Sequence, residues 1–168
     1  PEENAQEGRP LLLLEVGGQQ GCVHRVASFL GYDAQFRPTD DVKGCFEALR
    51  LVSREGMVFV GVDSETWLPG SAGTSGRSKE RPLGNDKNAA VAADNQNCSL
   101  AAACWRLAHS QGTRILLAMQ KDSRAFWHPE LRRAVAETRG EEIFARVVPL
   151  CMYGSSSPRE VMLVGTSE

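Results

Sequence analysis

The stretch Leu11-Leu-Leu-Leu-Glu-Val-Gly-Gly-Gln-Gln-Gly21 decides the fold to which the rest of the sequence must conform. Its apolar first half is continuous rather than alternating, which is typical of a strand buried on both faces. The glycines that follow indicate a tight turn. Apolar residues then recur at helical spacing, and Gly31 supplies a stop; they are Val23, Val26, Ala27 and Leu30. The opening of the chain is therefore predicted to be a strand, a glycine-rich turn and a helix.

Further strands and helices alternate along the chain beyond this unit. The expected elements are a strand over 32–37, a helix from Val42 that ends at Gly56, a strand over 57–62, an alanine-rich helix over 88–111 capped by Gly112, a strand over 113–119, a helix from Pro129, and a closing hairpin of 146–152 with 160–164. Strands separated by helices favour a mostly parallel sheet. The fold class is therefore predicted as α/β, a doubly wound Rossmann-like sheet with a C-terminal antiparallel hairpin.

Length and composition predict one folded unit. The chain has 168 residues, of which 42% are hydrophobic, enough to bury a sizeable core. We expect a loose terminus over 1–10 and a single domain over 11–168. A long loop is expected at about 68–88, and loops of that length are either functional or disordered. The first residue is Pro1 rather than Met, so the sequence is compatible with a fragment of a longer protein.

Charge and cysteine content restrict the partners. The formal net charge is −2 and the isoelectric point is about 6.0, so no global basic field attracts nucleic acid or anionic membrane. Five cysteines lack a repeated short spacing, which favours reduced thiols, and neither they nor the histidines show a zinc-ligand spacing. Apolar runs such as Leu11–Leu14 are far too short to cross a bilayer. We expect no membrane contact and an intracellular location, cytoplasmic or nuclear.

Several separated segments together resemble one family. They are Leu14–Val16, Gly21–Arg25, Trp67, Gly76–Asn85, Ala103–His109, Ile115–Leu117 and His128–Pro129. They resemble diverged cytosine-5 DNA methyltransferases of the S-adenosylmethionine-dependent, Rossmann-like class, of a kind abundant in dinoflagellates and related algae. The resemblance runs from about Leu11 to Gly165.

The resemblance implies a cofactor site and a damaged reaction centre. The turn with Glu15, Gly17, Gly18 and Gly21 would face S-adenosylmethionine, although glycines in this pattern also suit a plain tight turn. Ser64 stands where the family has its cysteine nucleophile, and Ala118 where it has a glutamate that protonates the base. Since covalent attack needs an activated nucleophile, cytosine methylation is not expected. The resemblance thus implies a degenerate methyltransferase-like domain, a pseudoenzyme that can still bind the cofactor or nucleic acid.

Two alternatives remain open. An active S-adenosylmethionine-dependent enzyme could use another acceptor, because methyl transfer depends mainly on alignment. A metal-dependent nuclease could use Asp63 and Glu65 after the strand 57–62, with Asp122 as a further carboxylate.

The 68–88 loop has its own two interpretations. Arg77, Lys79 and Arg81 could hold DNA or RNA, or could belong to a solvated flexible loop, since Glu80 interrupts them.

Overall fold

The computed structural model describes residues 11–18, 21–62, 65–138, 143–149 and 160–166. The elements are β1 Leu11–Gly17, α1 Cys22–Phe29, β2 Ala34–Arg37, α2 Val42–Leu51, β3 Val52–Gly61, η1 Glu65–Trp67, η2 Pro69–Ser71, α3 Ala72–Ser75, α4 Ala89–Gln111, β4 Arg114–Gln120, η3 Ala125–Trp127, α5 Pro129–Ala136, β5 Ile143–Pro149 and β6 Glu160–Thr166. The terminus expected to be loose, 1–10, lies outside the described residues.

The six strands form one mixed sheet in the order β2-β1-β3-β4-β6-β5. β1 pairs in parallel with β2 and β3, and β3 pairs in parallel with β4. β6 runs antiparallel to β4 and β5. The predicted fold class, a mostly parallel Rossmann-like sheet with an antiparallel C-terminal hairpin, is confirmed.

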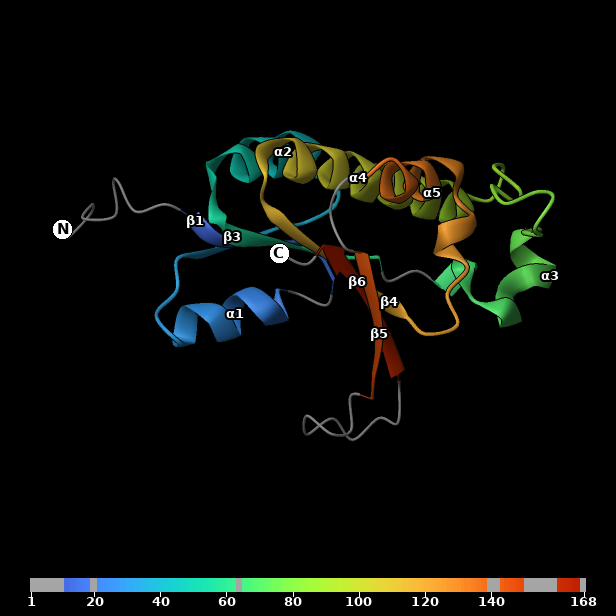
Figure 1. Cartoon of the computed structure of the whole chain (residues 1–168). Helices are drawn as coiled ribbons and strands as arrows, with labels where there is room; N and C mark the ends of the chain where they lie inside the picture. The colour runs from blue at the N-terminus through green and yellow to red at the C-terminus, as the bar shows by residue number, and fades with distance from the viewer. Residues whose placement is uncertain (1–10, 19–20, 63–64, 139–142, 150–159, 167–168) are drawn as a thin grey trace.

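Helices lie on both faces of this sheet but in unequal number. Among the helices that the structure describes, α2, α4 and α5 cover one face and α1 lies against the other (Figure 1). The chain leaves β1 toward β2 on one side and returns to β3 on the other, so the order reverses between β1 and β3. Such a switch point opens a crevice at the carboxyl ends of the two strands, where ligands of open α/β sheets bind.

The core lies between the sheet and the helices α2, α4 and α5, and α4 contributes the most buried side chains. This helix is alanine-rich, its first turn is capped by the Asn88 side chain, which accepts a hydrogen bond from the Ala90 N–H at 3.0 Å, and it ends at Gly112 with φ 67°. Trp105, Cys104 and Ala108 of α4 are completely buried. The helix predicted over 88–111 is thus confirmed together with its C-terminal cap Gly112, and the structure adds the Asn88 cap at its start.

Three details differ from the sequence-based expectations. Gly56 does not end α2, which stops at Leu51; it lies inside β3, which begins at Val52. The expected loop at 68–88 contains η2 and α3 in its first part. The apolar face predicted for α1 is only partly covered: the helix contacts β1 and β2, Val23 and Ala27 are half-buried, and Val26 and Leu30 are exposed. Across the described part of the chain, no helix combines the length and apolar character needed to cross a bilayer.

Candidate functional site

The glycine turn after β1 lies directly against the end of β3. Gly17, Gly18 and Gly21 have φ values of 66°, 79° and 68°, the left-handed conformation that favours glycine. A Cβ on Gly61 would lie 2.5 Å from the Cα of Gly18. The turn therefore depends on a glycine on each side, and this contact brings the carboxyl ends of β1 and β3 together.

Glu15, near the end of β1, places its carboxylate at the N-terminus of α1. Its Oε2 accepts a hydrogen bond from the His24 N–H at 2.7 Å, and the side chain is 1% exposed. Burial raises the pKa of Glu15, while the His24 N–H works against that rise. The N-terminus of a helix usually attracts anions, and here the chain supplies its own.

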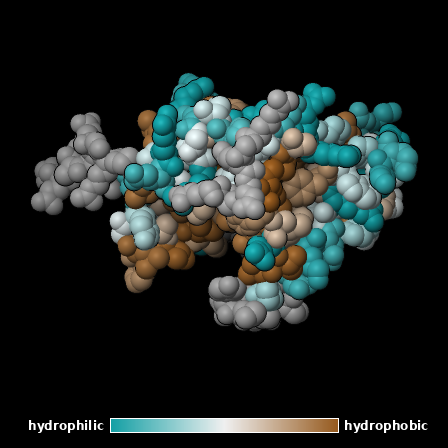
Figure 2. Space-filling view, in the orientation of Figure 1, coloured by the Kyte–Doolittle hydropathy of each residue, from teal (hydrophilic) through white to brown (hydrophobic). Residues whose placement is uncertain are grey.

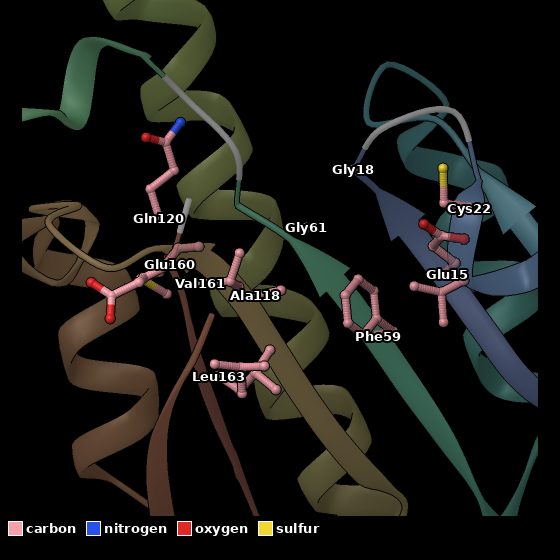
Figure 3. Close-up of a pocket in the computed structure, with 13 residues that line it drawn as sticks. Glu15, Gly18, Cys22, Phe59, Gly61, Ala118, Gln120, Glu160, Val161 and Leu163 are labelled. Atoms are coloured by element: carbon pink, nitrogen blue, oxygen red, sulfur yellow. The ribbon is translucent and has the colours of Figure 1, made fainter. Parts of the chain in front are cut away.

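A cavity of about 320 Å³ extends from this carboxylate across the sheet. Its lining residues come from α1 and from every strand except β2: Glu15, Gly18, Cys22, Val23, Phe59, Gly61, Ala118, Met119, Gln120, Val148, Glu160, Val161 and Leu163. Figure 3 shows Glu15 and Cys22 on one side, Gln120 and Glu160 on the other, with Phe59, Ala118 and Leu163 between them. The volume lies in the range of small-molecule sites, roughly 300–1,000 Å³.

The charged side chains that line this cavity are carboxylates. Its described lining includes two carboxylates, Glu15 and Glu160, and no Lys, Arg or His. Glu160 is exposed and forms an ion pair with Lys121, so Glu15 is the buried charge of the site. The cavity is chemically suited to a ligand group that is cationic or neutral.

The structure places part of the expected reaction centre in the same cavity. Ala118 lines it, and the Ala118 carbonyl accepts a hydrogen bond from the Val62 N–H at 2.8 Å. Asp63 and Ser64, which follow Val62, lie outside the described residues. The cavity therefore brings Ala118 together with Glu15 and Gly18, and the role expected for Ser64 stays a prediction.

The carboxylates of the nuclease alternative are only partly described. Glu65 is exposed at the start of η1, and Asp63 lies outside the described residues. Asp122 borders a separate hollow together with Lys121 and Glu160. Among the described residues, no group of three His, Cys, Asp or Glu side chains is arranged to hold a metal ion.

Arg77 requires a correction, because it is a buried side chain rather than a surface cation. It is 4% exposed, and its guanidinium lies 3.4 Å from the centroid of the Trp67 ring. It donates hydrogen bonds to the Thr66 hydroxyl, to the Pro82 and Val91 carbonyls and to the Asn95 side chain. It cannot bind nucleic acid without leaving these partners. Lys79 and Arg81 are exposed, and nucleic-acid binding through them stays a prediction.

Two features were not predicted from the sequence: the contribution of the hairpin to the cavity, and an acidic residue near the glycine turn that is not among the lining residues of the cavity. The hairpin supplies Val148, Val161 and Leu163 to the cavity, which follows from the pairing of β6 with β4 rather than from any motif. Asp40 lies three residues after the end of β2. Its neighbour Thr39 packs against the glycine turn, since a Cβ added to Gly17 would lie 2.7 Å from the Thr39 Cγ2. An acidic residue about 20 positions after the first glycine turn often binds ribose hydroxyls in Rossmann-like folds. The spacing between the glycine turn and Asp40 could therefore have been recognised in the sequence.

Comparison with known proteins adds little to this geometry. No protein-family model and no curated protein matches the chain. Among solved structures, the chain is similar to the crystal structure of the S. pombe Dnmt2 methyltransferase, with a TM-score of 0.49 and 9% sequence identity. The match covers 94% of this chain and 49% of that chain, so the chain spans about half of that protein's length. What the cavity binds is therefore inferred from its own residues.

The described cysteines differ sharply in accessibility, which predicts a labelling pattern. Cys22 is exposed, whereas burial raises the pKa of Cys45 to about 11 and that of Cys98 and Cys104 to about 12. In a Cys151→Ser background, one thiol per chain should react with Ellman's reagent in the native state and four after denaturation. Rapid native reaction of two or more thiols would contradict the packing of α2 and α4.

Proposed function

We propose that this domain binds S-adenosylmethionine in the cavity beside the glycine turn, and that it does not methylate cytosine. The observation that carries the proposal is the Glu15 carboxylate, buried at the N-terminus of α1 and bordering a cavity whose described lining contains no basic residue. On this proposal the chain is a degenerate cytosine-5 methyltransferase-like domain that retains ligand binding.

The charge of Glu15 discriminates between the nucleotide ligands of Rossmann-like folds. Dinucleotides place a pyrophosphate on the N–H groups of the first helix. In this chain the His24 N–H already donates to Glu15, and a phosphate would meet a like charge in a poorly solvated site. S-adenosylmethionine has no phosphate and carries a sulfonium cation, so the same carboxylate would attract it. Asp40 is a candidate partner for the ribose hydroxyls.

The absence of cytosine chemistry follows from the residue at position 118. A cytosine-5 enzyme needs a thiolate that attacks the ring and an acid that protonates it, and general acid catalysis alone contributes about 100- to 10,000-fold. Ala118 places a methyl group in the cavity where the resemblance puts that acid. Ser64 is a much weaker nucleophile than the expected cysteine. Both substitutions act against the same reaction.

Calorimetric titration with S-adenosylmethionine and S-adenosylhomocysteine tests the proposal. The two ligands differ by one methyl group and one positive charge. We expect saturable binding of both by the native chain. Glu15→Gln keeps an acceptor for the His24 N–H but removes the charge, so it should weaken S-adenosylmethionine about tenfold and S-adenosylhomocysteine much less.

The pH dependence of the same titration gives an independent check. Because burial raises the pKa of Glu15, the carboxylate is protonated at acidic pH, and affinity for the sulfonium should rise as pH increases through that pKa. The stability of the fold should change in the opposite direction. Because the folded state holds the Glu15 proton more tightly than the unfolded state, the contribution of Glu15 to the free energy of unfolding falls as pH rises over the same interval. Glu15→Gln should flatten both profiles.

Matched variants separate binding from general effects. Glu47→Gln alters an exposed carboxylate of α2 that pairs with Lys43, and should change neither affinity. Gly21→Val should abolish binding of both ligands, since its Cβ would lie 2.8 Å from the His24 ring and its φ is positive. Lack of heat with either ligand in a folded sample would refute the proposal. Transfer of a labelled methyl group to cytosine would refute its second half.

A further inference from the structure

Phe59 is an aromatic side chain on an inner strand of the sheet that the hydrophobic core does not use. It is half-buried, and it belongs neither to the described core residues nor to those packed against them. Its ring lines the 320 Å³ cavity instead (Figure 3). A large apolar side chain in a cavity wall forgoes much of the stabilisation that full burial gives. This position therefore makes Phe59 a candidate for ligand binding.

The Phe59 ring lies beside Glu15. The two residues are register partners in the parallel pairing of β1 with β3, so their side chains leave the sheet on the same face. Neighbouring strands are about 4.7–4.9 Å apart. The next residue on this face of β3 is Gly61, and its partner on β4 is Ala118. Because neither has a bulky side chain, the ring and the carboxylate border the same space at the carboxyl ends of the strands.

The remaining walls of this space are mainly apolar. Val23 of α1 lies on one side, and Val148, Val161 and Leu163 of the hairpin lie on the other. Figure 2 shows hydrophobic surface over α1 and a hollow between α1 and the β5–β6 hairpin. Apolar walls lower the local dielectric, which strengthens the attraction of a cation to a carboxylate and to an aromatic ring.

The two basic side chains near Glu15 have other partners. The Arg25 guanidinium donates to the Cys22 sulfur at 3.3 Å, and Nδ1 of His24 lies 2.9 Å from the Gly21 carbonyl oxygen. Burial raises the pKa of Glu15, and the charges of these two side chains only partly counteract it. Neither side chain lines the cavity. On the cavity side, the described residues therefore leave the charge of Glu15 uncompensated.

Hydrogen bonding restricts the class of cation that this site accepts. Glu15 already accepts from the His24 N–H and is 1% exposed, so its oxygens are poorly accessible to another donor. An ammonium or guanidinium group would lose hydrogen bonds to water on entry without regaining them. Sulfonium and quaternary ammonium groups have no N–H or O–H to satisfy, and they bind through charge and aromatic faces.

We propose that Phe59 and Glu15 together form a site for an alkyl-onium group, meaning a sulfonium or quaternary ammonium, and that Phe59 makes the site selective for such groups. The alkyl carbons contact the ring, and the buried carboxylate attracts the charge without a direct hydrogen bond. This inference rests on the proposed function in one respect, since the sulfonium of S-adenosylmethionine is the onium group expected there.

Three ligands that differ at one position test the selectivity. S-adenosylmethionine carries a methylsulfonium, its analogue sinefungin has a carbon with an ammonium group in that place, and S-adenosylhomocysteine has an uncharged thioether. Calorimetric titration at pH 8 should show sinefungin binding about fivefold more weakly than S-adenosylmethionine, although both are cations.

Two small probes test the onium site without the adenosine. Tetramethylammonium chloride should shift the Gly18 and Gly61 amide signals saturably in NMR titrations. Methylammonium chloride at the same ionic strength should leave them unchanged, because it donates hydrogen bonds that the site cannot accept.

Matched variants test the ring. Phe59→Leu should weaken S-adenosylmethionine and tetramethylammonium about fivefold to tenfold and S-adenosylhomocysteine less than twofold, whereas Phe59→Tyr keeps the ring and should bind like the native chain. Both variants should fold, as circular dichroism can verify, because Phe59 lies outside the core. Phe46→Leu makes the same replacement on α2, where Phe46 packs against the core, and should leave all affinities unchanged.

A fluorinated phenylalanine at position 59 separates charge from packing. Fluorine withdraws electron density from the ring face at nearly constant size, so onium binding should weaken progressively with the number of fluorines. Native-like affinity of the fluorinated chain, or equal losses of S-adenosylmethionine and S-adenosylhomocysteine in Phe59→Leu, would mean that the ring acts only by packing and would overturn the proposal.

The onium site and the proposed function fail in different ways. Binding of tetramethylammonium that depends on Phe59, without binding of S-adenosylmethionine, would refute the proposed function and support the onium site. Binding of S-adenosylmethionine that Phe59→Leu leaves unchanged would do the reverse. If a folded sample bound none of the ligands, both proposals would be wrong.

Discussion

Replacing Arg77 by methionine is expected to lower the free energy of unfolding by about 3–5 kcal/mol, the cost of removing one partner from a buried charged network. The guanidinium joins three segments: the Thr66 hydroxyl of η1, the Pro82 carbonyl of its own loop, and Asn95 with the Val91 carbonyl on α4. Methionine fills a similar volume but leaves these acceptors buried without donors. Urea denaturation followed by circular dichroism measures the change.

Thr66 makes this network cooperative. Its hydroxyl accepts from Arg77 and donates to Asp94, whose carboxylate also accepts from the Thr66 N–H at 3.2 Å. Arg77→Lys retains the charge, but a single ammonium cannot reach all of the acceptors that the planar fork reaches. We expect an intermediate loss of about 2–3 kcal/mol for that variant.

Arg81→Met is the matched control, since Arg81 is an exposed arginine of the same loop. Its effect should stay within about 0.5 kcal/mol, as for most surface substitutions. Equal losses for the two variants would mean that the loop is held by something other than the Arg77 side chain.

The sequence predicted this fold well where a local pattern determines the structure. The uninterrupted apolar run of β1, the glycine turn and the alanine-rich α4 with its Gly112 cap each depend on residues close in the chain. The hairpin was also recognised, although its described strands begin and end at other residues than expected. These features follow from periodicity and turn chemistry.

Long-range contacts explain what the sequence left undetermined. A basic residue in a Gly/Ser-rich loop is expected to be solvated. The residues next to Arg77 in the sequence do not indicate that Trp67 and Asn95 enclose its side chain. Likewise, helical spacing in α1 predicts an apolar face but not whether another element covers it. For the site, Glu15 was expected to face a ligand. Its burial at the N-terminus of α1 depends on the path of the glycine turn between β1 and α1, which the sequence alone does not determine.

Gly61→Ala is expected to disrupt the glycine turn, and with it the cavity. The added Cβ would lie 2.5 Å from the Cα and 2.6 Å from the N of Gly18, and both are backbone atoms that cannot rotate away. Gly61 is not among the positive-φ glycines, so the cost comes from this contact rather than from the conformation of alanine. We expect a loss of about 1–3 kcal/mol in the free energy of unfolding. Binding of S-adenosylmethionine should weaken by at least tenfold, because Gly18 lines the cavity.

Gly73→Ala separates this contact from the general effect of adding a methyl group. Gly73 lies in α3, and a Cβ there has nothing within 4 Å, so helix propensity predicts a gain of up to about 1 kcal/mol. Thermal unfolding and ligand titration of the two variants measure both consequences, and the stability readout does not depend on the identity of the ligand. If Gly61→Ala were as stable as Gly73→Ala, the turn could not lie against β3, and the cavity would lose the wall that joins Glu15 to Ala118.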